Sequence, residues 1–221
     1  RSLDGGRSWE PASTVIDCPG SGEDASSVID SCMVQDPGTG RVYVLIDHFP
    51  GGIGQPNCWA STGFDEHGRR LLRDLDDGRY VVEPDGAVTT IEGQATEFRV
   101  LDDGTVLCDG NPAGNIELAP GADPAETLLA IPTSYLQIAY SDDDGLTWSR
   151  PRDLNPELKQ PWMRFLGTCP GNGIALRNGP HAGRLIVPLY FNNDQNWLAM
   201  CATVAYSDDH GETWQLGHGP N

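Results

Sequence analysis

Several features that mark common protein classes are absent from this 221-residue sequence. No run of 18 consecutive apolar residues occurs, so the sequence predicts no transmembrane helix. The six cysteines are widely scattered and form no C-x-x-C pair, which argues against a zinc site, and we predict no bound metal. An even number of cysteines permits disulfides, but free cysteines packed as small apolar residues are an equal alternative.

Basic residues are scarce. The chain has 14 Lys and Arg against 32 Asp and Glu, which gives a formal net charge of −18. A charge of this sign argues against binding to nucleic acid or to an anionic membrane by bulk attraction. It does not exclude a small anionic ligand, because a local arginine cluster can override the global field. The simplest interpretation is a well-solvated surface.

Helical patterns are also rare, whereas Gly (27) and Pro (17) are abundant. This composition favours many short strands joined by tight turns. Residues 41–46 and 183–190 are nearly continuous apolar runs and predict inner strands. Asp-Gly pairs at 85–86 and 103–104 lie between alternating runs and predict hairpins. Residues 111–132 are rich in turn formers and predict a loop, and a short helical turn is expected only within 156–165.

An eight-residue pattern, Ser-x-Asp-x-Gly-x-Ser/Thr-Trp, occurs at 2–9, 141–148 and 207–214. The second and third copies start 66 residues apart, about the length of one four-stranded propeller blade. The first and second start 139 residues apart, so either one blade lacks the motif or a segment is inserted. The hairpins between the copies favour an insertion. We expect an all-β chain, part of a β-propeller, divided into 1–59 (blades), 60–118 (inserted hairpin subdomain) and 119–221 (blades).

Each copy of the pattern has the residues that a self-contained turn needs. The Asp can accept hydrogen bonds from backbone N–H groups of its own turn, the Gly takes the positive-φ position, and the Trp is expected to pack on the blade. We therefore interpret all three copies as structural, with the Asp and Trp residues Asp4, Trp9, Asp143, Trp148, Asp209 and Trp214. A calcium site at 142–145 is disfavoured because the further oxygen ligands of a calcium loop are missing.

The repeated pattern is the Asp box, or BNR repeat, of sialidases and of several unrelated propellers. Four segments, 28–50, 162–174, 177–185 and 206–214, resemble bacterial exo-sialidases of the large secreted type. The inserted hairpins resemble the small β-domain that these enzymes carry between blades. The resemblance implies a six-bladed propeller with a central sialic acid pocket, a secreted or cell-surface location, and no metal or organic cofactor.

The resemblance also implies a catalytic set. The family uses a Tyr nucleophile activated by a Glu, an Asp acid/base, and three arginines that clamp the substrate carboxylate. In the family these groups lie before the first Asp box or after the third. The present chain opens at one box and stops just after another, so we expect it to be incomplete and to hold no catalytic residue. We therefore expect this chain to be inactive by itself.

Two residues match the family's pocket positions, and a third is a candidate beside them. Asp30 matches an aspartate that contacts the ring substituents of the sugar, Phe49 matches a pocket aromatic, and Ile29 is a candidate for the pocket wall. The structural alternatives are that Asp30 caps a turn and that Phe49 is a core residue. Neighbouring Asp47 and His48 could titrate, although a histidine beside a Pro-Gly loop is usually at the surface.

A further cluster, Trp162, Arg164 and Phe165, suggests either a loop anchor or a rim that contacts substrate. The expected activity is retaining hydrolysis of terminal α-linked sialic acids on glycoproteins, glycolipids or oligosaccharides. Two alternatives remain open. One is a non-catalytic Asp-box propeller that binds sialylated glycans, and the other is an intramolecular trans-sialidase that releases an anhydro-sugar.

Overall fold

The computed structural model describes residues 1–192, 196 and 199–219. The described chain is built from three β-sheets and very little helix, which confirms the predicted all-β class. The helical pieces are α1 (Asn155–Leu158) and two 3₁₀ turns, η1 (Gly22–Asp24) and η2 (Gln55–Asn57). No helix in the described part of the chain is long and apolar enough to cross a membrane. No disulfide joins any of the six cysteines in the described chain, which favours the alternative of reduced cysteines left by the sequence.

The first sheet is blade-like and has the strand order β11-β10-β2-β1-β13. Its strands are β1 (Ser27–Gln35), β2 (Val42–Phe49), β10 (Tyr135–Ser141), β11 (Arg152–Asp153) and β13 (Gly171–Asn172). The pairs β1–β2, β2–β10 and β10–β11 are antiparallel, whereas β13 runs parallel to β1. The second Asp box connects β10 to β11, so it closes this sheet at its outer edge.

The second sheet repeats this plan. Its path is β12-β15-β16-β17, with β14 also paired to β15. The strands are β12 (Leu166–Thr168), β14 (Ile174–Ala175), β15 (Leu185–Asn192), β16 (Met200–Ser207) and β17 (Gln215–Leu216). The third Asp box connects β16 to β17. The predicted inner strands at 41–46 and 183–190 are therefore confirmed as parts of β2 and β15.

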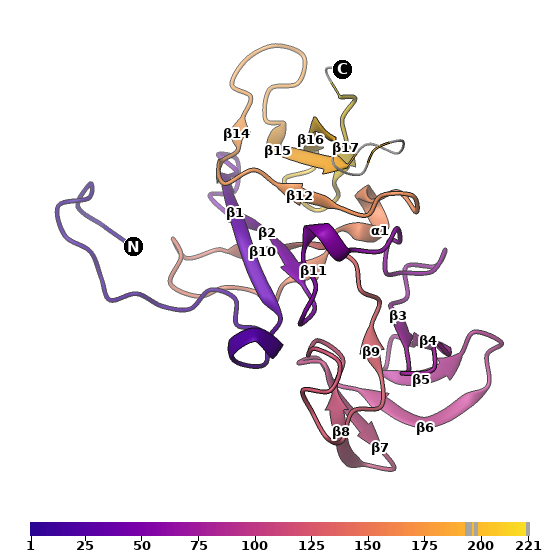
Figure 1. The fold of residues 1–221 in the computed structure, drawn as a ribbon. Helices are drawn as coiled ribbons and strands as arrows, with labels where there is room; N and C mark the ends of the chain where they lie inside the picture. The colour runs from indigo at the N-terminus through magenta and orange to yellow at the C-terminus, as the bar shows by residue number, and fades with distance from the viewer. Residues whose placement is uncertain (193–195, 197–198, 220–221) are drawn as a thin grey trace.

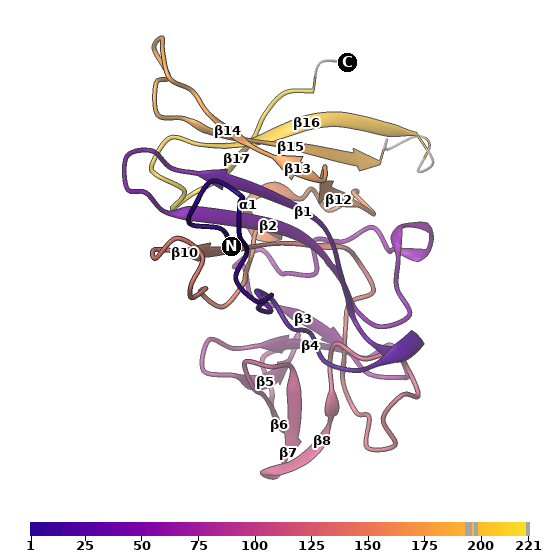
Figure 2. The ribbon, with the colours of Figure 1, turned by 90° about the vertical axis from the view of Figure 1, so that its left-hand side faces the viewer.

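The two blade-like sheets pack against each other, as Figures 1 and 2 show, and share one apolar core. Leu45 and Leu136 enter it from the first sheet, and Val187 and Leu189 from the second. These side chains are almost fully buried, so the core removes a large apolar area from water and holds the sheets in a fixed relation.

The third sheet is inserted between β2 and β10, which explains why the first two Asp boxes are so far apart. It follows the order β8-β7-β6-β5-β4-β3-β9 and lies beside the blades in Figures 1 and 2. Its strands are β3 (Leu71–Arg73), β4 (Arg79–Val82), β5 (Ala87–Thr90), β6 (Ala95–Val100), β7 (Thr105–Cys108), β8 (Asn111–Asn115) and β9 (Leu129–Ala130). The hairpins predicted at Gly86 and Gly104 are confirmed, and both glycines have positive φ (85° and 82°).

The loop predicted over 111–132 is wrong at both of its ends. The structure has β8 near its start and β9 near its end, and β9 pairs with β3. Both strands depend on pairing partners that local composition does not show. In β9, for example, the Ala130 N–H donates to the Ile116 carbonyl at 2.8 Å. The inserted sheet thus extends past residue 118, and the domain division at that position stays a prediction.

The three Asp boxes share one hydrogen-bond pattern. In the second box, the Asp143 carboxylate accepts bonds from the Ser141 hydroxyl (2.8 Å), the Thr147 N–H (2.8 Å) and the Thr147 hydroxyl (2.7 Å). The same three bonds form at Asp4 and at Asp209. Because these bonds favour the ionised form, starting with the one from the Thr147 N–H, the pKa of Asp143 falls to about 2. Each box is therefore a turn stabilised by its own internal hydrogen bonds.

The Trp of the box packs on a sheet in two copies only. Trp214 is 2% exposed and its ring meets Tyr43 edge-on at 6.2 Å, while Trp148 joins a small cluster with Val44 and Ile46. The prediction is wrong for Trp9, whose side chain is 73% exposed. The reason is that residues 1–21 form no strand in the described chain, so the first box has its internal bonds but no sheet beneath its Trp.

A buried charged cluster joins the inserted sheet to the first blade. Arg70 lies 2.7 Å from Glu117 and 3.8 Å from Asp153, and its guanidinium covers the ring of Tyr135. His48 lies 3.6 Å from Glu117 and is 2% exposed, so the expectation of a surface histidine is wrong. Burial lowers the pKa of His48 and keeps the ring neutral. This histidine therefore belongs to the junction between the two parts.

Candidate functional site

Asp30 lies at a β-bulge in β1, where the regular pairing with β2 is interrupted. The register of β1 with β2 shifts between Ile29 and Cys32, and Asp30 has φ = 54°. Aspartate tolerates this left-handed conformation better than most residues, and such bulges commonly re-aim a side chain. The Thr168 hydroxyl of β12 donates to the Asp30 carbonyl, and the Tyr190 hydroxyl of β15 donates to its carboxylate at 3.3 Å. Asp30 is therefore held by the neighbouring sheet in a fixed orientation.

Asp47 lies on β2 beside this bulge and is fully buried. Its Oδ1 atom accepts a hydrogen bond from the Thr168 N–H at 2.7 Å, whereas its Oδ2 atom has no hydrogen-bond partner. Burial, together with the charge of Asp30, raises the pKa of Asp47 to about 8 despite the opposing hydrogen bonds from Thr168. At neutral pH Asp47 is therefore mainly a neutral carboxylic acid beside a charged aspartate.

This burial predicts an unusual pH dependence of stability. The pKa of Asp47 is higher in the folded chain (about 8) than the ordinary value of 3.8, so the folded state binds more protons between these values. Its contribution to the free energy of unfolding is full below about pH 4 and is lost as the pH rises through 8. Between pH 5 and pH 9, the free energy of unfolding of the parent chain should fall with pH. In Asp47→Asn this fall should be smaller by several kcal/mol, as measured by urea unfolding.

The control for this experiment is Asp76→Asn, which removes a carboxylate from an exposed turn. That variant should keep the pH slope of the parent chain. Identical slopes in the parent and in Asp47→Asn would show that Asp47 is ionised in the folded state.

Aromatic rings pack beneath the Asp30 bulge. Phe49 and Phe165 are stacked with centroids 6.1 Å apart and planes 7° apart, and Phe165 lies 4.8 Å from the ring of Tyr190. Phe49 is 2% exposed, so it lies under the Tyr190 side of the site as a core residue. Burial, followed by the charges of Asp47 and Asp30, raises the pKa of Tyr190 to about 12. Its phenol therefore stays protonated and can donate to Asp30.

Exposed apolar residues flank the site. Ile29, next to Asp30, is 45% exposed, and Trp162 is 42% exposed with its ring edge-on to Phe191. Asn192 Oδ1 accepts bonds from the N–H groups of Arg164 and Phe165, both at 2.8 Å. The cluster predicted from the sequence is thus divided: Phe165 is a buried anchor, whereas Trp162 presents its ring to solvent.

Two Asp boxes match the BNR/Asp-box repeat family, at residues 139–150 and 205–216. The anhydrosialidase of Macrobdella decora is 32% identical over 97% of this chain and 33% of its own length. The sialidase of Micromonospora viridifaciens is 42% identical over 44% of this chain and 14% of its own length. The chain belongs to the Asp-box sialidase family. It spans about a third of the length of the Macrobdella decora anhydrosialidase.

Solved sialidase structures share the same fold. The intramolecular trans-sialidase of Ruminococcus gnavus, in complex with oseltamivir carboxylate, matches with a TM-score of 0.77 and 28% identity over 97% of this chain and 52% of its own. The leech intramolecular trans-sialidase matches with a TM-score of 0.78 and 26% identity over 97% of this chain and 37% of its own. These matches support the sialidase β-propeller predicted from the sequence.

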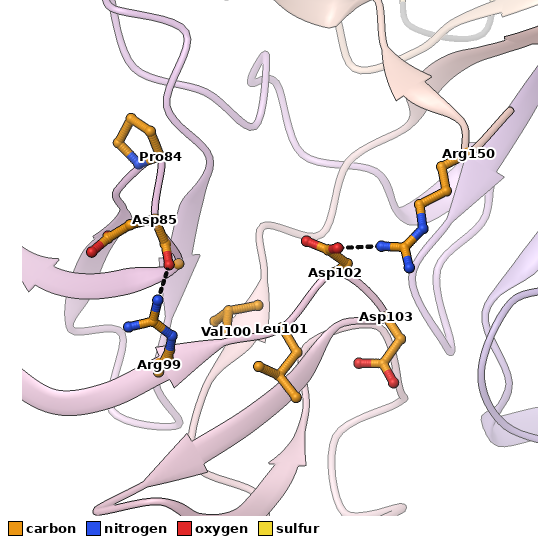
Figure 3. A pocket seen from close by; sticks show the side chains of 9 residues that line it. Pro84, Asp85, Arg99, Val100, Leu101, Asp102, Asp103 and Arg150 are labelled. Carbon is orange, nitrogen blue, oxygen red and sulfur yellow. Dashed lines mark hydrogen bonds and ion pairs between the residues drawn. The ribbon is translucent and has the colours of Figure 1, made fainter.

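A pocket away from Asp30 lies where the inserted sheet of this sialidase-family chain approaches the second Asp box (Figure 3). Its volume is about 450 Å³, and its lining includes Arg99, Asp102 and Arg150. Arg150 is paired with Asp102, and Arg99 donates to the carbonyl of Asp85. The charges that line this pocket are therefore satisfied by the chain itself, and the pocket is separate from the candidate pocket residues Ile29, Asp30 and Phe49.

The sequence missed two members of the site. Tyr190 was recognised only as a strand residue, and Asp47 only as a group that could titrate. Both meet Asp30 through β12 and β15, which are more than 100 residues away in the chain. The sequence held one weak signal for Asp47. A carboxylate within the apolar run of β2 is costly to bury, so its presence there indicates a specific role.

Proposed function

We propose that Asp30, Ile29 and Tyr190 form one wall of the sialic acid pocket of an exo-α-sialidase. The substrates would be sialylated glycoproteins, glycolipids or oligosaccharides outside the cell. The observation that supports this proposal most directly is the conformation of Asp30, a charged residue held at positive φ by two contacts from the neighbouring sheet. Backbone strain of this kind accumulates at functional sites.

The chemistry of this wall suits a polyhydroxylated ring. The Asp30 carboxylate can accept hydrogen bonds from hydroxyl or amide groups, and the bond from Tyr190 fixes its rotamer before a ligand binds. Phe49 would support this arrangement from below through Phe165. Because Asp30 is anionic, the carboxylate of sialic acid should point away from it, toward arginines outside this wall.

None of the described residues is proposed as a catalytic residue. The acid/base Asp, the Glu, the Tyr nucleophile and the clamp arginines are expected outside these 221 residues. The chain should therefore bind a sialoside weakly and should not cleave it, because binding to one wall does not stabilise a transition state.

A titration of the methyl-labelled chain with 3′-sialyllactose, followed by NMR, tests this proposal. We expect the Ile29 methyl signals to shift and saturate in the millimolar range, with lactose giving no shift. No sialic acid should be released during the titration. Release of sialic acid by this chain would overturn the placement of the catalytic groups, and unshifted Ile29 signals would overturn the proposed pocket.

An intramolecular trans-sialidase is the second candidate. A relative aligned over 97% of this chain is an anhydrosialidase, and two of the solved structures aligned over 97% of it are intramolecular trans-sialidases. The leech structure contains 2,7-anhydro-Neu5Ac prepared by soaking with 3′-sialyllactose. Mass analysis of the product of the whole protein separates the two candidates, because hydrolysis adds one water that intramolecular release does not.

A further inference from the structure

A second feature of the chain combines an exposed aromatic ring with two arginines. Trp59, in the segment that leads from β2 to the inserted sheet, is 40% exposed. The Arg73 and Arg79 guanidinium carbons lie 5.7 Å and 5.5 Å from the centre of its ring. Figures 1 and 2 show β3 and β4, which carry these arginines, at the end of the inserted sheet nearest the blades.

The two arginines form an unusual pair. Arg73 and Arg79 are directly opposite each other on the antiparallel strands β3 and β4. Like charges in this position repel each other and destabilise a hairpin. The chain has few basic residues, with 14 Lys and Arg against 32 Asp and Glu. A cross-strand pair of arginines is therefore unexpected unless an anion or the Trp59 ring compensates for the repulsion.

The nearby carboxylates do not neutralise this pair. Asp74 is already engaged, because it accepts bonds from the Gly78 N–H at 2.7 Å and from the Tyr80 hydroxyl at 2.9 Å. Asp77 is 68% exposed and only 3.9 Å from Arg73, a long contact of the kind that contributes little in water. Arg79 is exposed and forms no ion pair with any carboxylate of the described residues. Arg73 is mostly buried: its Nη1 atom donates to the Asp74 carbonyl at 3.4 Å, and its buried Nε atom has no hydrogen-bond partner. The guanidinium donors left available to a ligand are therefore mainly those of Arg79.

The backbone of Trp59 is anchored on both sides. Its backbone N–H donates to the Pro132 carbonyl at 2.7 Å, and its backbone carbonyl accepts from the Thr133 hydroxyl at 2.8 Å. A residue whose backbone is already held loses less freedom when a ligand binds. The face of an indole suits the apolar face of a sugar ring, and paired guanidinium groups suit a carboxylate.

We propose that Trp59, Arg73 and Arg79 form a secondary binding site for a carboxylate-bearing saccharide. The sugar ring would lie on Trp59, and its carboxylate would take the donors of Arg79 and Arg73. This site would hold an acidic glycan on the inserted sheet and raise its local concentration near the blades. The choice of a sialylated sugar as the carboxylate-bearing ligand rests on the proposed function, whereas the site itself does not use Asp30.

The test is carried out in the 221-residue chain with Asp30→Ala, so that the two sites can be separated. The indole N–H signal of Trp59, assigned by its loss in Trp59→Phe, is followed by NMR during titration with 3′-sialyllactose. The signal should shift and saturate, and Arg79→Gln should weaken the binding about tenfold or more. Arg99→Gln, a matched exposed arginine on the same inserted sheet, should leave the binding unchanged.

A second variant keeps the test decisive if Arg79→Gln does not fold. Asp77→Asn removes the carboxylate that competes for Arg73, so it should tighten the binding about twofold. An unshifted Trp59 signal, an equal response to lactose or to inorganic sulfate, or equal losses in Arg79→Gln and Arg99→Gln would each overturn the proposal. In the chain with native Asp30, a Trp59 response without an Ile29 response would contradict the proposed pocket alone.

Discussion

Asp30→Ala is expected to abolish saturable binding of 3′-sialyllactose at the Ile29 methyl signals. The substitution removes the Asp30 carboxylate, which is the acceptor of the Tyr190 hydroxyl. Hydrogen bonds to a charged group contribute roughly 1.5–3 kcal/mol each, so the loss of one should weaken binding by about tenfold to about 150-fold. Binding that starts in the millimolar range would then no longer saturate. The NMR titration described above measures this directly.

Asp30→Asn and Ser31→Ala are the matched controls. Asparagine keeps the shape and tolerates the left-handed backbone, so Asp30→Asn should fold like the parent chain and weaken binding less than Asp30→Ala. Ser31 is an exposed residue in the same bulge, and its replacement should leave the titration unchanged. If Asp30→Ala binds as tightly as Ser31→Ala, Asp30 is a structural bulge residue and the proposed wall is wrong.

The parts of the fold that the sequence predicted are those set by neighbouring residues. The Asp box is complete within eight residues, as the bonds of Asp143 show, and the hairpins at Gly86 and Gly104 follow from Asp-Gly pairs. The inner strand β15 follows from an apolar run. Each of these signals is local, and each is confirmed.

The parts that could not be predicted depend on distant partners. Strand β9 exists because β3 offers it an edge, and Trp9 is exposed because no strand underlies the first box. The candidate site shows the same limit, since Tyr190 and Asp30 are 160 residues apart and meet only after two sheets pack. Asp30 itself was recognised by resemblance, whereas its positive φ depends on the register shift between β1 and β2.

The contact between the third Asp box and the first sheet leads to the largest expected effect on stability. Gly211 has φ = 89°, and a methyl group at this position would overlap the ring of Tyr43. That ring cannot move freely, because its hydroxyl donates to the His210 carbonyl at 2.5 Å and its edge meets Trp214. Gly211→Ala should therefore separate the two blade-like sheets and lower the free energy of unfolding by roughly 2–5 kcal/mol.

Gly145→Ala isolates the steric part of this effect. Gly145 occupies the same position of the second box with φ = 81°, but the nearest atom to an added methyl group is 3.6 Å away, on Trp148. Its replacement should lower the free energy of unfolding only by the cost of placing alanine in the left-handed conformation, about 1–2 kcal/mol. Urea unfolding of both variants measures the difference. If Gly145→Ala and Gly211→Ala are equally destabilised, Tyr43 is free to move aside, and the third box does not lock the two sheets together.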